Sequence, residues 1–146
     1  MIVYVDSSVL ARAYLADDVG HSQVSSLLED PEIGLLTGTW TQIEVSGALV
    51  RAARAGRGEE AGLLALLDGD LGPDGPVTVV AADQTAVERH ALQLVREHAI
   101  RAMDAWHLAV AALVMPDLLE PGERAGFATR DEAQSAAAAT LGLLPV

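Results

Sequence analysis

The 146-residue sequence contains no cysteine, and aromatic residues make up only 3 % of it. The absence of cysteine excludes disulfide-stapled scaffolds and metal sites built from thiolates, and it fits a reducing compartment. No apolar stretch approaches the roughly 20 residues that a membrane-spanning helix needs. Asp6 also interrupts the first apolar run before it reaches the length of a signal peptide. We therefore expect a cytoplasmic protein with no membrane partner.

Positive charge is scarce as well. The chain carries 21 acidic residues against 9 basic ones, all of them arginine, and its formal net charge is −12. This balance argues against broad, non-specific binding to nucleic acid, but it leaves room for a nucleic-acid enzyme whose few cations are clustered. Arginine suits phosphate recognition, although a composition bias towards Arg, Ala and Gly explains the lack of lysine more simply.

Short apolar runs alternate with helical patterns along the chain. Strands are predicted at 2–5, 34–37, 77–81, 126–129 and 143–146. Helices are predicted after Ser8 and at 21–29, 40–55, 59–67, 85–99, 101–114 and 131–141, with loops at 69–76 and 115–126. This alternation predicts one domain, residues 1–146, with an α/β fold: a three-layer α/β/α sandwich around a central, mostly parallel sheet of four or five strands.

Four acidic residues fall at predicted strand ends or in the first turn of the helix that follows: Asp6, Glu44, Asp104 and Asp131. Because parallel strands present their carboxyl ends at one edge of the sheet, we expect these side chains to approach one another there. Clustered carboxylates without basic partners oppose folding unless a cation lies among them. Oxygen ligands suit Mg²⁺ or Mn²⁺, so the sequence predicts a metal site at this edge.

Each acid also has a purely structural explanation. Asp6 can cap the helix that follows it, and capping boxes are available at Thr41 with Glu44 and at Thr129 with Glu132. The helix dipole favours an acid in the first turn of any helix. Caps do not, however, require that all four acids share one edge of a sheet, and this coincidence favours the metal site.

The segments around the four acids resemble the motifs of PIN-domain ribonucleases, and they occur in the order of that family. They are YVDSSVL at 4–10, TQIEV at 41–45, RAMDAWHLA at 101–109 and FATRD at 127–131. The resemblance spans the whole chain, and the length of a single domain is most similar to the VapC toxins of bacterial type II toxin–antitoxin (VapBC) pairs. It implies the PIN-like α/β/α fold already predicted from the element order.

The resemblance further implies a Mg²⁺-dependent endoribonuclease, with Mn²⁺ as a substitute, that acts as the toxin of such a pair. By analogy Asp6 and Asp104 are the most direct metal ligands, while Glu44 and Asp131 complete the catalytic site directly or through water. A metal-activated water would attack, which leaves 5′-phosphate and 3′-hydroxyl ends. Implied partners are an RNA substrate and a cognate antitoxin protein; the apolar composition additionally suggests a homodimer.

Several polar side chains are expected to support this site. By the resemblance, Ser8 and Thr129 hydrogen-bond the carboxylates or bound water. Three arginines on the helical face of Glu44 can hold RNA phosphates, or can simply complement the end of the helix dipole: Arg51, Arg54 and Arg57. Arg130 can hold a phosphate or pair with the neighbouring acids.

Two residues near Asp104 need separate interpretation. Trp106 departs from the resembled motif, in which a smaller apolar residue is usual, and we expect it to pack in the core. His107 lies on the helix face of Asp104, but without a nucleophile motif for a hydrolase triad we expect a packed or helix-bonded histidine. The alternative function is a non-catalytic PIN-like RNA-binding or scaffold subunit. A phosphorylated receiver domain and an aspartyl phosphatase are disfavoured, since lysine is absent and Ser8 stands where the phosphatase needs a second Asp.

Overall fold

Strand β1 (Ile2–Val5) is the centre of the fold. The computed structural model describes residues 1–146, and in it β1 pairs in parallel with β2 (Gly34–Gly38) on one side and β4 (Ala125–Ala128) on the other. The edges are β3 (Val77–Val80) and the short β5 (Leu144–Pro145), which gives the order β3-β2-β1-β4-β5. All four pairings are parallel, so the predicted parallel sheet of four or five strands is confirmed.

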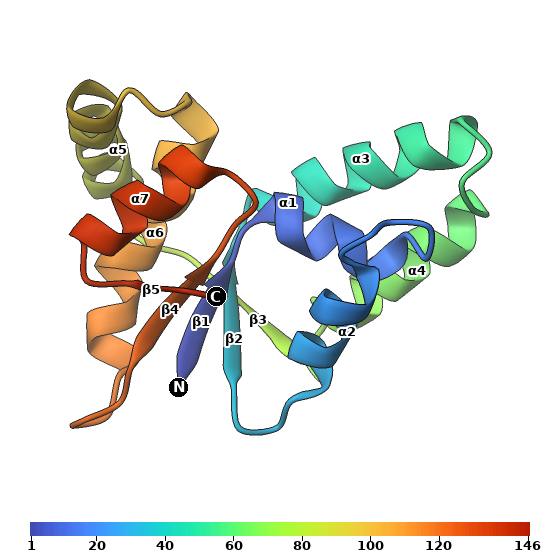
Figure 1. The fold of residues 1–146 in the computed structure, drawn as a ribbon, viewed down its shortest axis with the longest axis horizontal. Helices are drawn as coiled ribbons and strands as arrows, with labels where there is room; N and C mark the ends of the chain where they lie inside the picture. Colours follow the sequence, from blue (N-terminus) through green and yellow to red (C-terminus); the bar gives the residue numbers. More distant parts are fainter.

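Helices cover both faces of this sheet (Figure 1). One layer contains the helices of the first half of the chain: α1 (Ser7–Leu10), the 3₁₀ helix η1 (Ala11–Tyr14), α2 (His21–Glu29), α3 (Thr41–Arg54) and α4 (Glu60–Asp70). The other contains those of the second half: α5 (Gln84–His98), α6 (Ala102–Leu118) and α7 (Glu132–Thr140). The predicted three-layer α/β/α sandwich is therefore confirmed.

The alternation of side chains along β1 divides the interior into two cores. Val3 and Val5 belong to the core under α1 to α4, whereas Tyr4 belongs to the core under α5 to α7. Because successive residues of a strand point to opposite faces, a strand covered on both faces must be apolar throughout. This requirement explains why the short apolar run Ile2–Val5 predicts a buried strand.

Two elements differ from the sequence prediction. The helix after Ser8 is a short α-helix followed by a 3₁₀ turn, and α6 continues to Leu118, through a segment predicted as a loop. Pro116 favoured that loop because proline removes a helical hydrogen bond. The helix nevertheless extends past it, since Met115 is buried in the core and burial of this side chain outweighs local propensity. No helix combines the length and apolar character that crossing a membrane requires.

Candidate active site

The site begins where β1 and β4 end side by side. Val5 is in register with Ala128, so the next residues, Asp6 and Thr129, are neighbours at the carboxyl edge of the sheet. The amide of Asp6 donates to the carbonyl of Ala128 at 3.1 Å. The Thr129 hydroxyl lies 2.9 Å from Asp6 Oδ2. Parallel pairing thus brings together two segments that are 123 residues apart in sequence.

Asp6 is a buried carboxylate, only 3 % exposed. Its Oδ1 accepts hydrogen bonds from the Ser8 hydroxyl at 2.7 Å and from the amide of Val9 at 3.0 Å, and its Oδ2 faces the Thr129 hydroxyl. Asp6 also caps helix α1, as its position after the strand predicted. It forms no salt bridge, although burying a carboxylate away from water carries a large energetic cost unless a cation compensates it.

Thr129 connects Asp6 to the start of helix α7. Its oxygen accepts from the amide of Asp131 at 3.1 Å, and its hydroxyl also contacts the side-chain oxygen of the buried Gln134. A hydroxyl carries one proton, so Thr129 donates to either Asp6 or Gln134 at any moment. Gln134 in turn donates to the backbone oxygen of Asp104 at 3.1 Å, which fixes the first turn of α6 relative to Asp6.

Asp104 and Asp131 share one cation, the guanidinium of Arg101. Its Nε lies 2.7 Å from Asp104 Oδ2, and its Nη2 lies 3.3 Å from both Asp104 Oδ1 and Asp131 Oδ2. The hydrogen bond and the charge of Asp104 raise the pKa of Arg101 above its usual range. The Arg101 side chain is 76 % exposed, so it holds the two carboxylates from the solvent side. No sequence pattern predicted this role of Arg101 in the site.

Glu44 is held from the interior by His107. The His107 Nε2 atom lies 2.6 Å from Glu44 Oε2, and its Nδ1 lies 2.9 Å from the hydroxyl of the buried Tyr4. Partial burial by itself would raise the pKa of Glu44, but the hydrogen bond from His107 counters it, and that pKa is lowered overall. The expectation of a packed or helix-bonded His107 is therefore incomplete: the ring is buried, but it binds a site carboxylate instead of its own helix.

The tautomer of His107 follows from its two partners. An ionised Glu44 can only accept, so Nε2 carries the proton. Burial raises the pKa of Tyr4, so its hydroxyl stays protonated and can donate to Nδ1. A neutral ring in the Nε2–H form satisfies both bonds. Tyr4 and His107 thus connect the core to the acidic edge, a contact between strand β1 and helix α6 that no local sequence pattern could have indicated.

Neither of the capping boxes that the sequence left open as an alternative is present. Helix α3 has Trp40 at its N-cap without a side-chain hydrogen bond, and Thr41 instead bonds the Thr37 hydroxyl at 2.7 Å. Helix α7 is capped by Asp131, whose Oδ1 accepts from the amide of Gln134 at 2.9 Å. Glu44 is consequently free of the capping role and points to His107.

Three of the four acids, Asp6, Glu44 and Asp104, line one open cavity of about 750 Å³. Asp131 lines the adjoining cavity and is joined to this one through Arg101. No three acidic or histidine side chains lie close enough to ligate one ion. Mg²⁺ is nevertheless commonly held by one or two carboxylates with water completing its shell. An unpaired, buried Asp6 beside Asp104 fits such a site.

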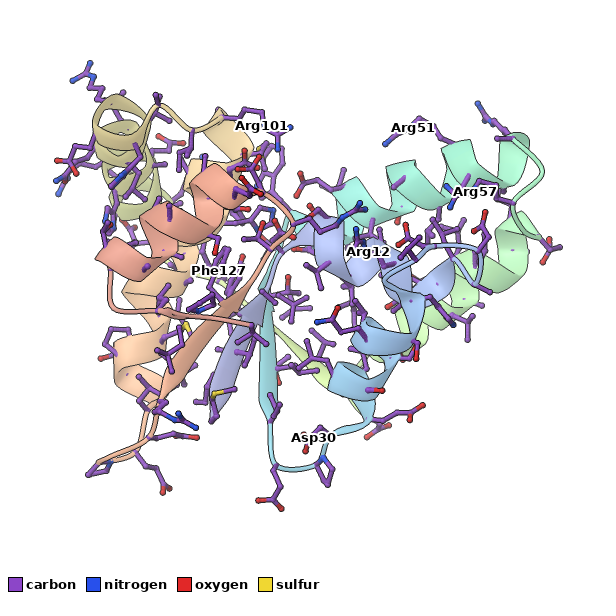
Figure 2. All side chains as sticks on the ribbon, viewed as in Figure 1. Arg12, Asp30, Arg51, Arg57, Arg101 and Phe127 are labelled. Atoms are coloured by element: carbon purple, nitrogen blue, oxygen red, sulfur yellow. The ribbon has the colours of Figure 1, made fainter.

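The arginines are distributed unevenly around this cavity. Arg51 and Arg130 line it, and Figure 2 places Arg51 and Arg101 at the same edge of the molecule, on opposite helical layers. Arg130 also approaches Asp18 at 3.8 Å. Arg54 is exposed in the last turn of α3, outside the lining of the cavity. Arg57 forms a two-pronged ion pair with Asp17, at 2.8 and 2.9 Å, so its guanidinium is already engaged away from the acids.

Comparison with known proteins agrees with this architecture. The PIN domain family matches the chain over residues 3–139. No curated protein matches it.

Similar solved structures include VapC20 of Mycobacterium tuberculosis, a toxin that cleaves the sarcin–ricin loop (TM-score 0.63, 22 % identity, covering 92 % of this chain and 94 % of that one). PAE2754 of Pyrobaculum aerophilum is similar with a TM-score of 0.65 and 19 % identity, and the match covers 100 % of this chain and 90 % of that one. A toxin–antitoxin complex of Klebsiella pneumoniae is similar with a TM-score of 0.52 and 17 % identity, and the match covers 88 % of this chain and 86 % of that one. At these identities the likeness is one of fold.

Proposed function

This chain belongs to the PIN domain family, and we propose that it is a Mg²⁺-dependent endoribonuclease that acts as the toxin of a toxin–antitoxin pair. The observation that carries the proposal is the state of Asp6. It is a buried carboxylate with no ion-pair partner, and it opens into the same cavity as Glu44 and Asp104. A helix cap does not require two further carboxylates in the same cavity, whereas a cation site does.

Asp6 and Asp104 are the proposed direct ligands, and Glu44 and Asp131 act directly or through water. When bound, Mg²⁺ would polarise the phosphoryl group and supply hydroxide from a bound water. Mn²⁺ has the same preference for oxygen and is expected to substitute.

The remaining side chains position these acids and the substrate. Ser8 and Thr129 keep the Asp6 carboxylate in one orientation through their hydroxyls. His107 contacts Oε2 of Glu44 and so holds that carboxylate in position at the acidic edge. Arg101 offsets part of the negative charge of Asp104 and Asp131 and, being exposed, could turn to an RNA phosphate if these carboxylates held a metal ion. The products would carry 5′-phosphate and 3′-hydroxyl ends.

The arginines at the rim of the cavity are proposed to bind phosphates of the RNA. Arg51 and Arg130 are well placed for this role, since both line the acidic cavity. Arg54 can reach only a more distant part of the strand, and Arg57 would first have to leave Asp17. The substrate is proposed at the level of its class, single-stranded or looped RNA.

Protein partners form the second part of the proposal. Structural neighbours include a toxin–antitoxin complex, and the net charge of −12 suits an antitoxin with a basic segment. Exposed large apolar side chains, among them Ile43 at 67 % and Leu66 at 58 %, are consistent with a covered surface and a homodimer. We propose a cytoplasmic location, where the RNA substrate would be found.

The first test is cleavage of total cellular RNA by purified, antitoxin-free protein in Mg²⁺ or Mn²⁺, with mapping of new 5′-phosphate ends. Asp6→Asn and Asp104→Asn should each reduce cleavage at least 10- to 100-fold, roughly the loss seen when even a supporting residue of a metal ligand is removed. EDTA should have the same effect. The matched control is Asp74→Asn, the same substitution at an exposed loop residue outside the cavity, which should cleave like the wild type.

Thermal unfolding separates a missing metal site from a missing activity. Mg²⁺ should raise the melting temperature of the wild type and of Asp74→Asn, because an ion that binds only the folded state stabilises it. The increase should be smaller in Asp6→Asn. Protein that gains stability from Mg²⁺ but cuts no RNA would contradict the nuclease and favour the non-catalytic RNA-binding subunit.

A further inference from the structure

Both tryptophans of the chain line one cavity beside the candidate active site. The sequence contains only two, Trp40 and Trp106, and they meet in a cavity of about 480 Å³ between the end of β2 and helices α5 and α6. The rest of its lining is mainly apolar and includes Val80, Val87, Ala91 and Val110. Trp106 packs against the core, as expected from the sequence, and it also lines this cavity.

This tryptophan cavity adjoins the acidic cavity. Ala102 and Met103, which immediately precede Asp104, line both of them. Trp40 stands four residues before Glu44, and Trp106 two residues after Asp104. The elements that carry the two acids thus also carry the two indoles, so a ligand in the tryptophan cavity has a fixed position relative to the acids.

The two indoles have different roles in this geometry. Their ring centroids lie 6.1 Å apart with an interplanar angle of 56°, too tilted to hold a flat ligand between them. Trp106 packs edge-on against His107, at 5.2 Å and 86°, and is the inner wall. Trp40 is 48 % exposed, although a large aromatic side chain is costly to leave in water. It offers a free aromatic face at the mouth of the cavity.

Charge indicates what kind of ligand would lie on that face. No arginine lines the tryptophan cavity, so it is unsuited to a phosphate, whereas Arg51, Arg101 and Arg130 all line the acidic cavity next to it. A chain with a net charge of −12 gains little general attraction for RNA. Stacking of bases on aromatic rings does not depend on that attraction and is the other main source of affinity for single strands.

We propose that the tryptophan cavity binds a nucleobase of single-stranded RNA, stacked on Trp40, while the adjoining phosphates lie in the acidic cavity. The inference rests on the proposed function for the identity of its ligand. Gln84 and Glu88 also line the cavity and are joined by a hydrogen bond of 2.8 Å, so they present polar atoms to the edge of a base. An apolar wall with a few polar groups is the usual form of a base pocket.

Tryptophan fluorescence reports on this cavity alone, because the chain has no other tryptophan. In EDTA, where no cleavage is expected, a short single-stranded oligoadenylate should quench it saturably. A ribose-phosphate strand of equal length without bases should not. Trp40→Ala should raise the Kd by about 5- to 100-fold, the range that loss of one stacked base produces, and Trp40→Phe by less. Leu118→Ala, which removes another exposed apolar side chain outside both cavities, is the matched control.

Equal quenching by the base-free strand, or unchanged binding by Trp40→Ala, would overturn the proposal. Steady-state cleavage keeps this result separate from the proposed function. If the wild type cleaves RNA and Trp40→Ala cleaves it with the same KM, the base site is wrong and the nuclease stands. If the wild type binds bases through Trp40 but cleaves nothing, the base site stands and the nuclease is wrong. If Trp40→Ala binds RNA normally but loses a co-expressed antitoxin, the cavity belongs to a protein partner and the base site is wrong.

Discussion

At the scale of single residues, the least expected contact is the chain of hydrogen bonds from Tyr4 through His107 to Glu44. Its three members come from strand β1, helix α6 and helix α3, so the bond pattern fixes one carboxylate of the site against the core. With its proton on Nε2, the His107 ring donates to the carboxylate of Glu44 and accepts from the hydroxyl of Tyr4. Removing the hydroxyl leaves Nδ1 buried without a donor.

We therefore predict that Tyr4→Phe lowers the free energy of unfolding by about 1–3 kcal/mol, the cost of one unsatisfied buried polar group. Cleavage should fall about 10- to 100-fold, because the His107 ring loses one of the two hydrogen bonds that position it against Glu44. Urea unfolding and RNA cleavage measure the two effects, and the ¹⁵N shifts of the His107 ring report the tautomer directly. Wild-type ¹⁵N shifts that place the proton on Nδ1 instead of Nε2 would contradict the assignment.

The matched control is Tyr14→Phe. The Tyr14 hydroxyl donates to Asp70 at 3.0 Å in the opposite core, far from the acidic edge. This variant should lose stability, by about 0.5–1.5 kcal/mol for one ordinary hydrogen bond, without loss of cleavage. The same chemical deletion then separates destabilisation from a change in the site.

At the scale of elements, the end of strand β2 determines how closely helix α6 approaches the sheet. A Cβ atom at the buried Gly38 would lie 2.6 Å from the Tyr4 hydroxyl and 2.7 Å from Trp106. Real Cβ atoms do not approach other atoms this closely, so only glycine fits. The strand therefore ends at a residue without a side chain because two aromatic groups of the site meet its backbone there.

Gly38→Ala is accordingly predicted to reduce stability by about 1–3 kcal/mol, the usual cost of overpacking a core. It should also reduce cleavage, since both Tyr4 and Trp106 must move. Gly69→Ala is the control: its Cβ would meet nothing within 4 Å on helix α4, and it should stabilise the protein by about 0.5–1 kcal/mol. Chemical denaturation of both variants tests the contrast, and equal stabilities would contradict the close approach.

At the scale of the whole molecule, the composition makes alkaline titration unusually simple. Without lysine or cysteine, tyrosine is the only side chain whose ordinary pKa, about 10, lies in the alkaline range below that of arginine. Burial raises the pKa of Tyr4, and burial followed by the nearby Asp70 raises that of Tyr14. Both hydroxyls stay protonated in the folded protein while they ionise in the unfolded chain.

The folded state consequently binds more protons than the unfolded state above pH 10. The stability that the two tyrosines provide is complete below pH 10 and is lost as the pH rises, by about 1.4 kcal/mol per pH unit for each of them. Tyr14→Phe should halve this slope. Tyrosinate absorbance should appear together with unfolding; its appearance near pH 10 in protein with native circular dichroism would contradict the prediction.

The sequence by itself determined the order of strands and helices, the parallel sheet and the four acidic positions, because these follow from local apolar patterns and from the short motifs around Asp6, Glu44, Asp104 and Asp131. A strand covered on both faces has to be apolar throughout, and that requirement is visible in a short stretch of sequence. The PIN domain match agrees with what those patterns and motifs predicted.

Only the tertiary structure decided which side chains face one another across the sheet. Four contacts join elements that are distant in sequence. They are the bridge of Arg101 between two acids, the link from His107 to Glu44, the close approach at Gly38 and the contact between the two tryptophans. Helix α6 likewise continues through Pro116 because its core partners outweigh local propensity. Such contacts depend on the register and packing of whole elements, and short-range patterns contain no information about them.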